Sequence, residues 1–193
     1  KWNSNIEYVN KSYALPLTRI TVSGFLKRFF EDKFGVGSEV ILNGINYKTF
    51  NNFDKKLNSP PVILFMEHIL ENKNTKGAIE IVKKLKHKFP EVRFKCFGKE
   101  KYYELPDFVE FIKDPNDEQI AKLYSTSDIF LYTSTFEGFG LPPAEAMACK
   151  CAVVGNRVAA FPEFAENKKS AMIVSPNDPD EMSMAVEYFL NNK

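Results

Sequence analysis

The chain has 193 residues, of which 44% are hydrophobic and 26% are charged, so it can bury one good-sized core and has the composition of an ordinary α/β domain. Its 26 basic and 25 acidic side chains leave a formal net charge of +1, which excludes a global field that would attract nucleic acid or an acidic membrane surface. Any anion must therefore be bound by a local site.

The first 38 residues fit a regular pattern least well. Arg19–Ser23 is typical of a strand and Phe25–Phe34 of a helix, whereas the residues before Arg19 have no clear period. We interpret residues 1–38 as the remnant of a preceding N-terminal domain and its linker. Residues 39–193 then form the main domain, which the Asn43-Gly44 turn signal helps to set apart.

From Pro61 onwards, strand patterns alternate with amphipathic helix patterns. Val62–Met66 is a continuous apolar run, which is typical of a strand covered on both faces. Apolar residues recur at helical spacing between Lys76 and Phe89, and Pro90 ends that helix. The remaining predicted strands are Val92–Phe97, Phe108–Ile112, Asp128–Tyr132, Cys151–Gly155 and Ala171–Val174, and the remaining predicted helices are Asn116–Ser125, Pro142–Cys149 and one capped by Asp178. This order predicts a doubly wound, Rossmann-like α/β fold with a parallel sheet.

The stretch from Ser134 to Ala148 has the strongest features of a site. It follows the predicted strand that ends at Tyr132 and opens the next helix, so it lies at the carboxyl edge of the sheet, where open α/β folds bind ligands. Gly138 and Gly140 permit close approach of the backbone to a ligand. Two prolines suit the first helical turn, and the remaining free amides there favour a phosphate.

Glu137 and Glu145 lie on either side of this phosphate-like position. Each glutamate taken alone has a simpler interpretation. Glu145 could serve merely to complement the helix dipole, and Glu137 could be an ordinary solvated loop residue. Their joint placement around two glycines favours another interpretation. Two carboxylates beside a phosphate would repel it unless they served neutral groups rich in hydrogen-bond donors, such as sugar hydroxyls.

The run E-G-F-G-L-P-P-A-E-A-M-A, in which Glu137 and Glu145 are separated by seven residues, resembles the EX7E motif of retaining glycosyltransferases of the GT-B fold in family 4. Ile20–Ser23 and Val40–Ile45 are similar to the interdomain segment of these enzymes. The resemblance extends from about residue 18 to the end. It implies that the chain is one half of a GT-B fold and that residues 39–193 are its nucleotide-sugar-binding domain.

The resemblance also implies roles for individual residues. Glu145 would accept hydrogen bonds from the ribose, Glu137 would contact the transferred sugar, and Lys76 would neutralise the diphosphate leaving group. Glu137 and Lys76 are thus the expected catalytic residues. The remaining expected donor-binding positions are the backbone at Gly138, Phe139, Gly140 and Leu141, and the surroundings of the base at Gly98 and Ile112.

The sequence departs from the family pattern in several places, two of which concern the expected site. The usual Gly-Arg after the first strand of this domain is replaced by Glu67-His68, and we interpret His68 as a substitute for the arginine. A structural role is the alternative for a lone histidine, as a solvated lysine is for Lys76. Ala159-Ala160 stands where a Gly-Gly pair is common, which argues against close backbone approach there.

The activity implied by the resemblance is transfer of a sugar from a nucleoside diphosphate sugar, with retention. The acceptor would be a sugar, a lipid-linked glycan or a protein, bound through an N-terminal half that is missing here, and this domain would be inactive without that half. No metal and no other cofactor is implied, because no D-x-D pair lies in a suitable loop. The alternatives are a nucleotide-sugar epimerase of the same fold and a non-catalytic nucleotide-binding module.

The cysteines and the apolar runs bear on the compartment. Cys96, Cys149 and Cys151 have no metal-ligand spacing, and their odd number indicates reduced, buried thiols. No apolar run approaches the length of a membrane span, and the first ten residues lack the pattern of a signal peptide. We therefore expect a cytoplasmic protein, whose full-length form would associate with a membrane only peripherally.

Overall fold

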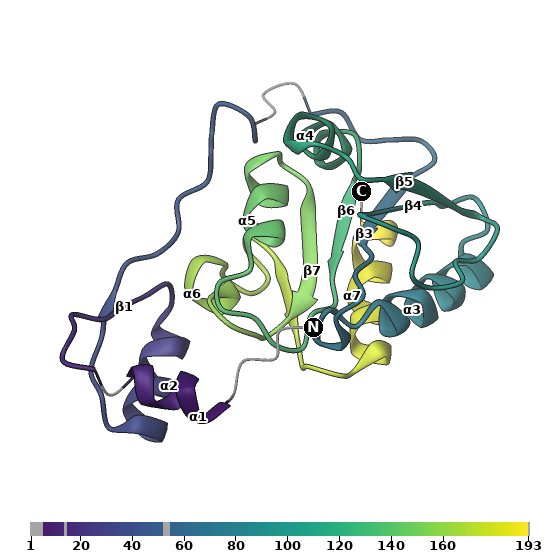
Figure 1. Cartoon of the computed structure of the whole chain (residues 1–193). Coiled ribbons are helices and arrows are strands. Elements are labelled where there is room, and N and C mark those ends of the chain that lie inside the picture. The colour runs from purple at the N-terminus through teal and green to yellow at the C-terminus, as the bar shows by residue number, and fades with distance from the viewer. Residues whose placement is uncertain (1–5, 14, 52–54, 193) are drawn as a thin grey trace.

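A computed structural model of the chain describes residues 6–13, 15–51 and 55–192. Its centre is a six-stranded parallel sheet in the order β5-β4-β3-β6-β7-β8 (Figure 1). The strands are β3 (Val62–Met66), β4 (Arg93–Gly98), β5 (Val109–Lys113), β6 (Ile129–Tyr132), β7 (Ala152–Asn156) and β8 (Met172–Val174). The predicted doubly wound fold is confirmed, with each of these strands within one residue of its predicted start.

Helices cover both faces of this sheet. On one face lie α3 (Thr75–Lys88) and α7 (Pro179–Asn191), and on the other lie α4 (Asp117–Ser125), α5 (Leu141–Ala148) and α6 (Phe161–Phe164). Alternate residues of each strand supply the two resulting cores: Ile63 packs in the cluster with α3 and α7, and Leu64 packs in the cluster with α4 and α5. Burial on both faces explains why the central strands β3 and β6 are apolar throughout.

Side-chain caps fix where three of the helices that cover the sheet begin. The Asn116 side chain accepts a hydrogen bond from the backbone amide of Gln119, and the Gln119 side-chain oxygen accepts one from the backbone amide of Asn116. These two bonds form a capping box at the start of α4. Asp178 caps α7 by accepting from the amide of Glu181. The Asp178 cap was predicted, and for α4 the sequence pattern left Asn116 and the residue before it as alternatives, of which Asn116 is the cap. At α3 the cap is Asn74, whose own backbone is left-handed, with φ +52°.

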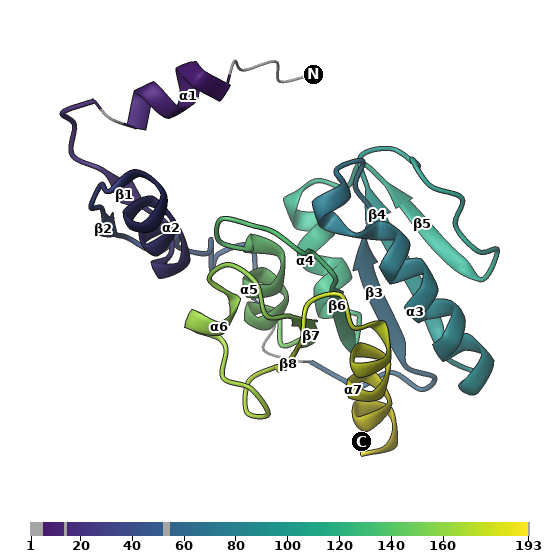
Figure 2. The same ribbon diagram turned by 90° about the horizontal axis from the view of Figure 1, so that it is seen from below.

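The N-terminal part of the described chain lies to one side of the sheet (Figures 1 and 2). It consists of α1 (Ile6–Tyr13), α2 (Gly24–Phe34) and the parallel pair β1 (Ile20–Thr21) and β2 (Glu39–Val40). The predicted strand and helix are present, but α1 was not predicted. The Tyr13 ring of α1 packs against the Phe30 ring of α2, with 4.8 Å between the ring centroids. This helix is therefore associated with a tertiary contact and not with a clear hydrophobic period in its sequence.

An extended segment runs from β2 past α5 towards α4 and leads into β3 (Figure 1). Phe50 is buried there, 6.4 Å from the ring of Tyr124, and Lys55 donates to the carbonyl oxygen at the end of α4. Asp128 then accepts from the amides of Asn58 and Val62, which sets the entry to β3. Within the described ranges, no helix is long and apolar enough to cross a bilayer.

Candidate functional site

The segment 133–140, which we call the glycine loop, connects β6 to α5 at the carboxyl edge of the sheet. Two neighbouring elements hold it. The Asn156 side chain, at the end of β7, donates to the carbonyl oxygen of Thr133 at 2.9 Å. Asn72, in the short helix η1 (Glu71–Lys73), accepts from the amide of Thr135 at 2.7 Å and donates to the carbonyl oxygen of Phe136 at 2.7 Å. The loop is therefore fixed to its neighbours on both sides of β6.

The two glycines of the loop differ in backbone conformation, since only Gly140 has a positive φ. Gly140 has φ +93°, and a Cβ there would lie 2.8 Å from the Tyr132 hydroxyl. Its backbone thus needs glycine, as the sequence indicated. At Gly138, the carbonyl oxygen accepts a 2.8 Å hydrogen bond from the Ser23 hydroxyl. Ala159 has φ +53°, so the backbone takes a conformation that favours glycine even though the sequence has alanine there.

Backbone donors are available where the glycine loop enters α5. Across residues 138–141, no amide donates to a protein acceptor in the described parts of the chain. Pro142 and Pro143 have no N–H to contribute, so the available donors concentrate at the very start of the helix. The Phe139 side chain is buried against Phe164 at 5.2 Å between ring centroids. We call these four amides the loop amides.

Glu137 forms an ion pair with Lys73, the last residue of η1. Its carboxylate also accepts from the Ser134 hydroxyl at 3.0 Å. The lysine and glutamate side chains are only 17% and 14% exposed, so this pair is shielded from water. Because water screens this position only partly, the two charges interact more strongly with a charged ligand there than they would on an open surface.

Sequence reasoning proposed Lys76, at the start of the helix after this polar loop, and did not identify Lys73. Lys76 is exposed in the first turn of α3 and lines a hollow of ≈280 Å³ with Asp178 and with Thr133, at the start of the glycine loop; Glu137 is not part of that lining. The structure therefore brings Lys73, and not Lys76, to Glu137. The signal in the sequence was weak, because it shows two lysines three residues apart without showing which one η1 and the left-handed Asn74 turn inward.

His68 lies beside this ion pair. Its Nδ1 accepts from the amide of Leu70 at 3.0 Å, so in the neutral form Nε2 carries the proton. Burial lowers the pKa of His68, and the nearby Lys73 charge lowers it further against the opposing effect of Glu137. His68 is thus placed as a neutral hydrogen-bond donor at Nε2 rather than as a cation.

Glu145 lies in α5 and faces α4, whereas Glu137 faces η1. Burial raises the pKa of Glu145 to about 7, and Asp117 adds to the rise, while the Tyr124 hydroxyl opposes it. That hydroxyl is buried and has no hydrogen bond of normal geometry to any described residue, although Glu145 is the charged group with the largest effect on its pKa. Near neutral pH, the Glu145 carboxyl is therefore close to the midpoint between its protonated and ionised forms.

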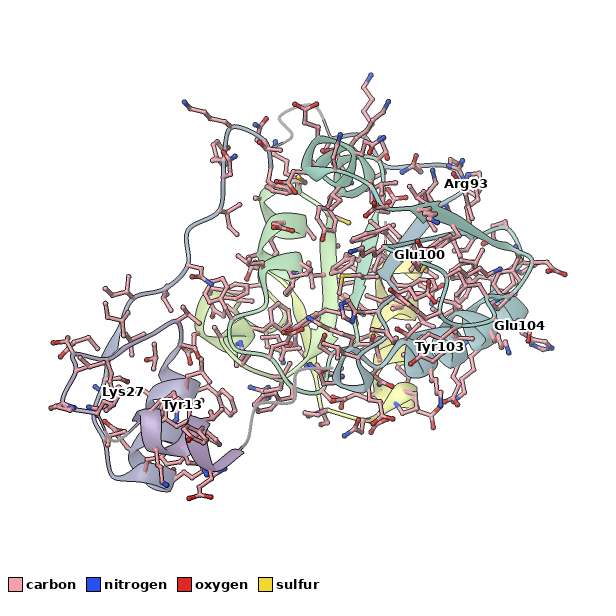
Figure 3. The ribbon with its side chains drawn as sticks, viewed as in Figure 1. Tyr13, Lys27, Arg93, Glu100, Tyr103 and Glu104 are labelled. Atoms are coloured by element: carbon pink, nitrogen blue, oxygen red, sulfur yellow. The ribbon has the colours of Figure 1, made fainter. Side chains whose placement is uncertain are left out.

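Gly98 is the last residue of β4 and Ile112 the penultimate residue of the neighbouring β5, at the same edge of the sheet. A Cβ on Gly98 would lie 2.8 Å from the backbone oxygen of Glu67, so the strands approach closely only because glycine is there. Glu67, which sequence reasoning did not identify, is buried, and its Oε1 accepts from the amides of Tyr102 and Tyr103 at 2.7 and 2.6 Å. These bonds fix the loop after β4, where Figure 3 labels Tyr103 on the side of the sheet away from Lys27.

Comparison with known proteins identifies related sequences. Residues 48–193 match the family described as "Glycosyl transferases group 1". O-antigen chain mannosyltransferase B of Escherichia coli is 40% identical over 67 residues, which are 35% of this chain and 17% of that protein. O-antigen chain mannosyltransferase RfbU of Salmonella typhimurium is 34% identical over 84 residues, which are 44% of this chain and 23% of that protein. The chain thus aligns with less than a quarter of the length of either relative.

Solved structures share the fold. The Anabaena protein Alr3699/HepE, in complex with UDP-glucose, superposes with a TM-score of 0.80 at 18% sequence identity. The superposition covers 97% of this chain and 57% of the Anabaena chain. At this identity the likeness concerns the fold.

Proposed function

This chain belongs to the group 1 glycosyl transferases, with the GT-B type of fold, and on that premise we propose that it binds a nucleoside diphosphate sugar for transfer to an acceptor. Both curated relatives described above are named mannosyltransferases, so mannose is the first sugar to test. We further propose that the anomeric configuration is retained, in keeping with the EX7E pattern of Glu137 and Glu145.

The observation that supports this proposal most is the arrangement around the glycine loop. The loop amides and the Lys73 ammonium supply positive charge and donors to a diphosphate. Glu145 lies on the α4 side, where it would accept from the ribose hydroxyls, and Glu137 lies on the η1 side, where it would accept from a hydroxyl of the transferred sugar. Gly98 and Ile112 would border the base.

In the proposed reaction, these residues stabilise the nucleoside diphosphate as it leaves. As the bond between the anomeric carbon and the phosphate oxygen breaks, negative charge grows on that oxygen, where Lys73 and the loop amides lower its energy. His68 would add a neutral hydrogen bond from Nε2. The acceptor oxygen attacks on the face that the phosphate leaves, and the phosphate oxygen takes the proton of the acceptor hydroxyl.

We assign the leaving-group role to Lys73 because it contacts Glu137, and Lys76 is the alternative that the tests must compare. A positively charged side chain with several backbone amides can carry this charge without a metal ion. We therefore propose that transfer needs no metal, and addition of a chelator to the assay should leave the rate unchanged.

Incubation of the protein with donor sugar, first alone and then with candidate acceptors, tests the proposed activity. Transfer predicts release of nucleoside diphosphate together with a glycosylated product. Conversion of the donor to its epimer would indicate the isomerase alternative, which the mannosyltransferase relatives do not favour. Binding of the donor without either product would identify a non-catalytic binding module.

A further inference from the structure

A second hollow, of ≈460 Å³, lies where α2 meets the glycine loop and α6. Arg28 of α2 and Arg157, directly after β7, both line it, and so does Glu137. We call it the arginine hollow. Because Glu137 belongs to its lining, the hollow is continuous with the position proposed for the transferred sugar. Lys73, His68 and the loop amides are not part of its lining.

Hydrogen bonds hold the walls of the arginine hollow together. The Glu163 carboxylate, in α6, accepts from the amides of Gly24 and Phe25 at 2.9 Å each, at the start of α2. The Ser23 hydroxyl donates to the carbonyl oxygen of Gly138 at 2.8 Å. These three bonds fix α2 against the loop and α6, so the hollow is built by specific contacts between distant parts of the sequence.

In this hollow the carboxylates have hydrogen-bond or ion-pair partners, whereas the arginines have none in the described part of the chain. Both of its carboxylates are engaged, Glu137 by Lys73 and Ser134 and Glu163 by the two α2 amides. Arg28 and Arg157, by contrast, make no ion pair or side-chain hydrogen bond with any residue that the structure describes. The other two arginines of the chain, Arg19 and Arg93, both donate to backbone carbonyl oxygens.

Two guanidinium groups beside one hollow favour an anion. Arginine presents a planar set of donors that matches the oxygens of phosphate and carboxylate groups, and it is the residue most used for their recognition. The wall also has an apolar part, because Phe25 and Phe136 pack edge to face at 5.9 Å and Phe136 is 52% exposed. A ligand with both an apolar face and a negative charge fits these walls best, and a sugar ring that carries a phosphate or a carboxylate has both.

We propose that the arginine hollow binds the acceptor, and that this acceptor carries a phosphate or carboxylate close to the hydroxyl that receives the sugar. This inference rests on the proposed glycosyl transfer, since it places the acceptor next to Glu137. Arg28 and Arg157 would hold the anionic group while the Phe136 ring packs against the sugar. The donor diphosphate has a separate set of partners in Lys73 and the loop amides.

The test compares anionic and neutral sugars while the donor position is filled. Calorimetry with the full chain, saturated with nucleoside diphosphate, would measure binding of mannose 6-phosphate, glucuronic acid and mannose. We expect either the phosphorylated sugar or the sugar acid to bind at least about tenfold more tightly than mannose, in line with a charge-assisted hydrogen bond. Which of the two binds more tightly distinguishes a phosphorylated acceptor from an acidic one.

Variants assign that binding to the hollow. The double substitution Arg28→Gln with Arg157→Gln should remove the preference for the charged sugar and leave nucleoside diphosphate affinity unchanged. Arg93→Gln, at the start of β4 and distant from the hollow, is the matched control and should alter neither. Equal binding of mannose and both anionic sugars, or no binding of any of them, would overturn the proposal. So would an equal loss of nucleoside diphosphate affinity in the double variant, because the arginines would then serve the donor.

Failure of the acceptor proposal is distinguishable from failure of the donor proposal. Should the unsubstituted chain bind no nucleoside diphosphate at all, the proposed glycosyl transfer fails before the hollow is tested. Thermal unfolding of each variant would check the fold, and we expect the substitutions of these exposed arginines to leave it intact.

Discussion

Lys73 and Glu137, 64 residues apart in the sequence, form a shielded ion pair that joins η1 to the glycine loop. The pair places a cation next to the loop amides and fixes the carboxylate proposed to contact the sugar. It also means that the two side chains depend on each other. Removal of either one leaves a mostly buried charge without its partner, which is costly in a medium of low polarity.

Lys73→Gln should weaken nucleoside diphosphate binding by tenfold or more, because a charge-assisted contact to phosphate is lost. It should also lower the free energy of unfolding by about 1 to 3 kcal/mol, since Glu137 is left with Ser134 alone. Lys76→Gln, in the neighbouring first turn of α3, is the control and should change both quantities little. Calorimetry and urea unfolding measure the two effects, and a larger loss of diphosphate affinity in Lys76→Gln would return the role to that residue.

The binding of nucleotides should depend on pH through Glu145. Ribose hydroxyls are donors, so they favour the ionised carboxylate, and ionisation requires the pH to rise past the pKa of about 7. Affinity for a nucleoside diphosphate should therefore increase between pH 6 and 8. In Glu145→Gln the affinity should be lower and this rise should disappear; a rise that persists in the variant would assign it to another group.

The same carboxyl predicts the opposite trend for the protein without ligand. Its pKa rises from the ordinary 4.5 to about 7 on folding, so between these values the folded state binds more protons than the unfolded state. The free energy of unfolding should therefore fall as the pH increases from about 4.5 to 7, by about 1 to 3 kcal/mol once solvent screening is considered. Urea titrations at several pH values should show this fall, and Glu145→Gln should flatten it.

Gly140→Ala should destabilise the glycine loop. The positive φ and the 2.8 Å approach of a Cβ to the Tyr132 hydroxyl both oppose a side chain at this position. We expect a loss of about 1 to 3 kcal/mol in the free energy of unfolding and weaker diphosphate binding. Gly37→Ala is the control, since a Cβ there meets no atom within 4 Å. Equal effects of the two substitutions would show that the loop tolerates another conformation.

Much of the fold could be predicted because its signals are local. Val62–Met66 is apolar along its whole length, and Asn116 and Asp178 are good helix caps that precede amphipathic stretches. The helix α1 could not be predicted, since its residues become ordered together with contacts such as that between Tyr13 and Phe30. Contacts of this kind arise between segments and leave no period in either one.

The site shows the same division. The glycine loop with Glu137, and Glu145 in the helix that follows, were singled out from a pattern within one short stretch. Lys73 and Glu67 were missed, because their importance depends on partners far along the chain: Lys73 pairs with Glu137, and Glu67 holds the amide of Tyr103. The sequence shows which residue types are present in a loop, and the tertiary structure decides which of them turn inward.

Binding of a nucleoside diphosphate and of the matching diphosphate sugar, each to the unsubstituted chain, Glu145→Ala and Glu137→Ala, tests the central claim most directly. If the two carboxylates serve different ends of one donor, Glu145→Ala weakens both ligands, whereas Glu137→Ala spares the free nucleotide and weakens only the sugar-bearing one. Unchanged affinity for both ligands in both variants would contradict the assignment of a donor site to the glycine loop.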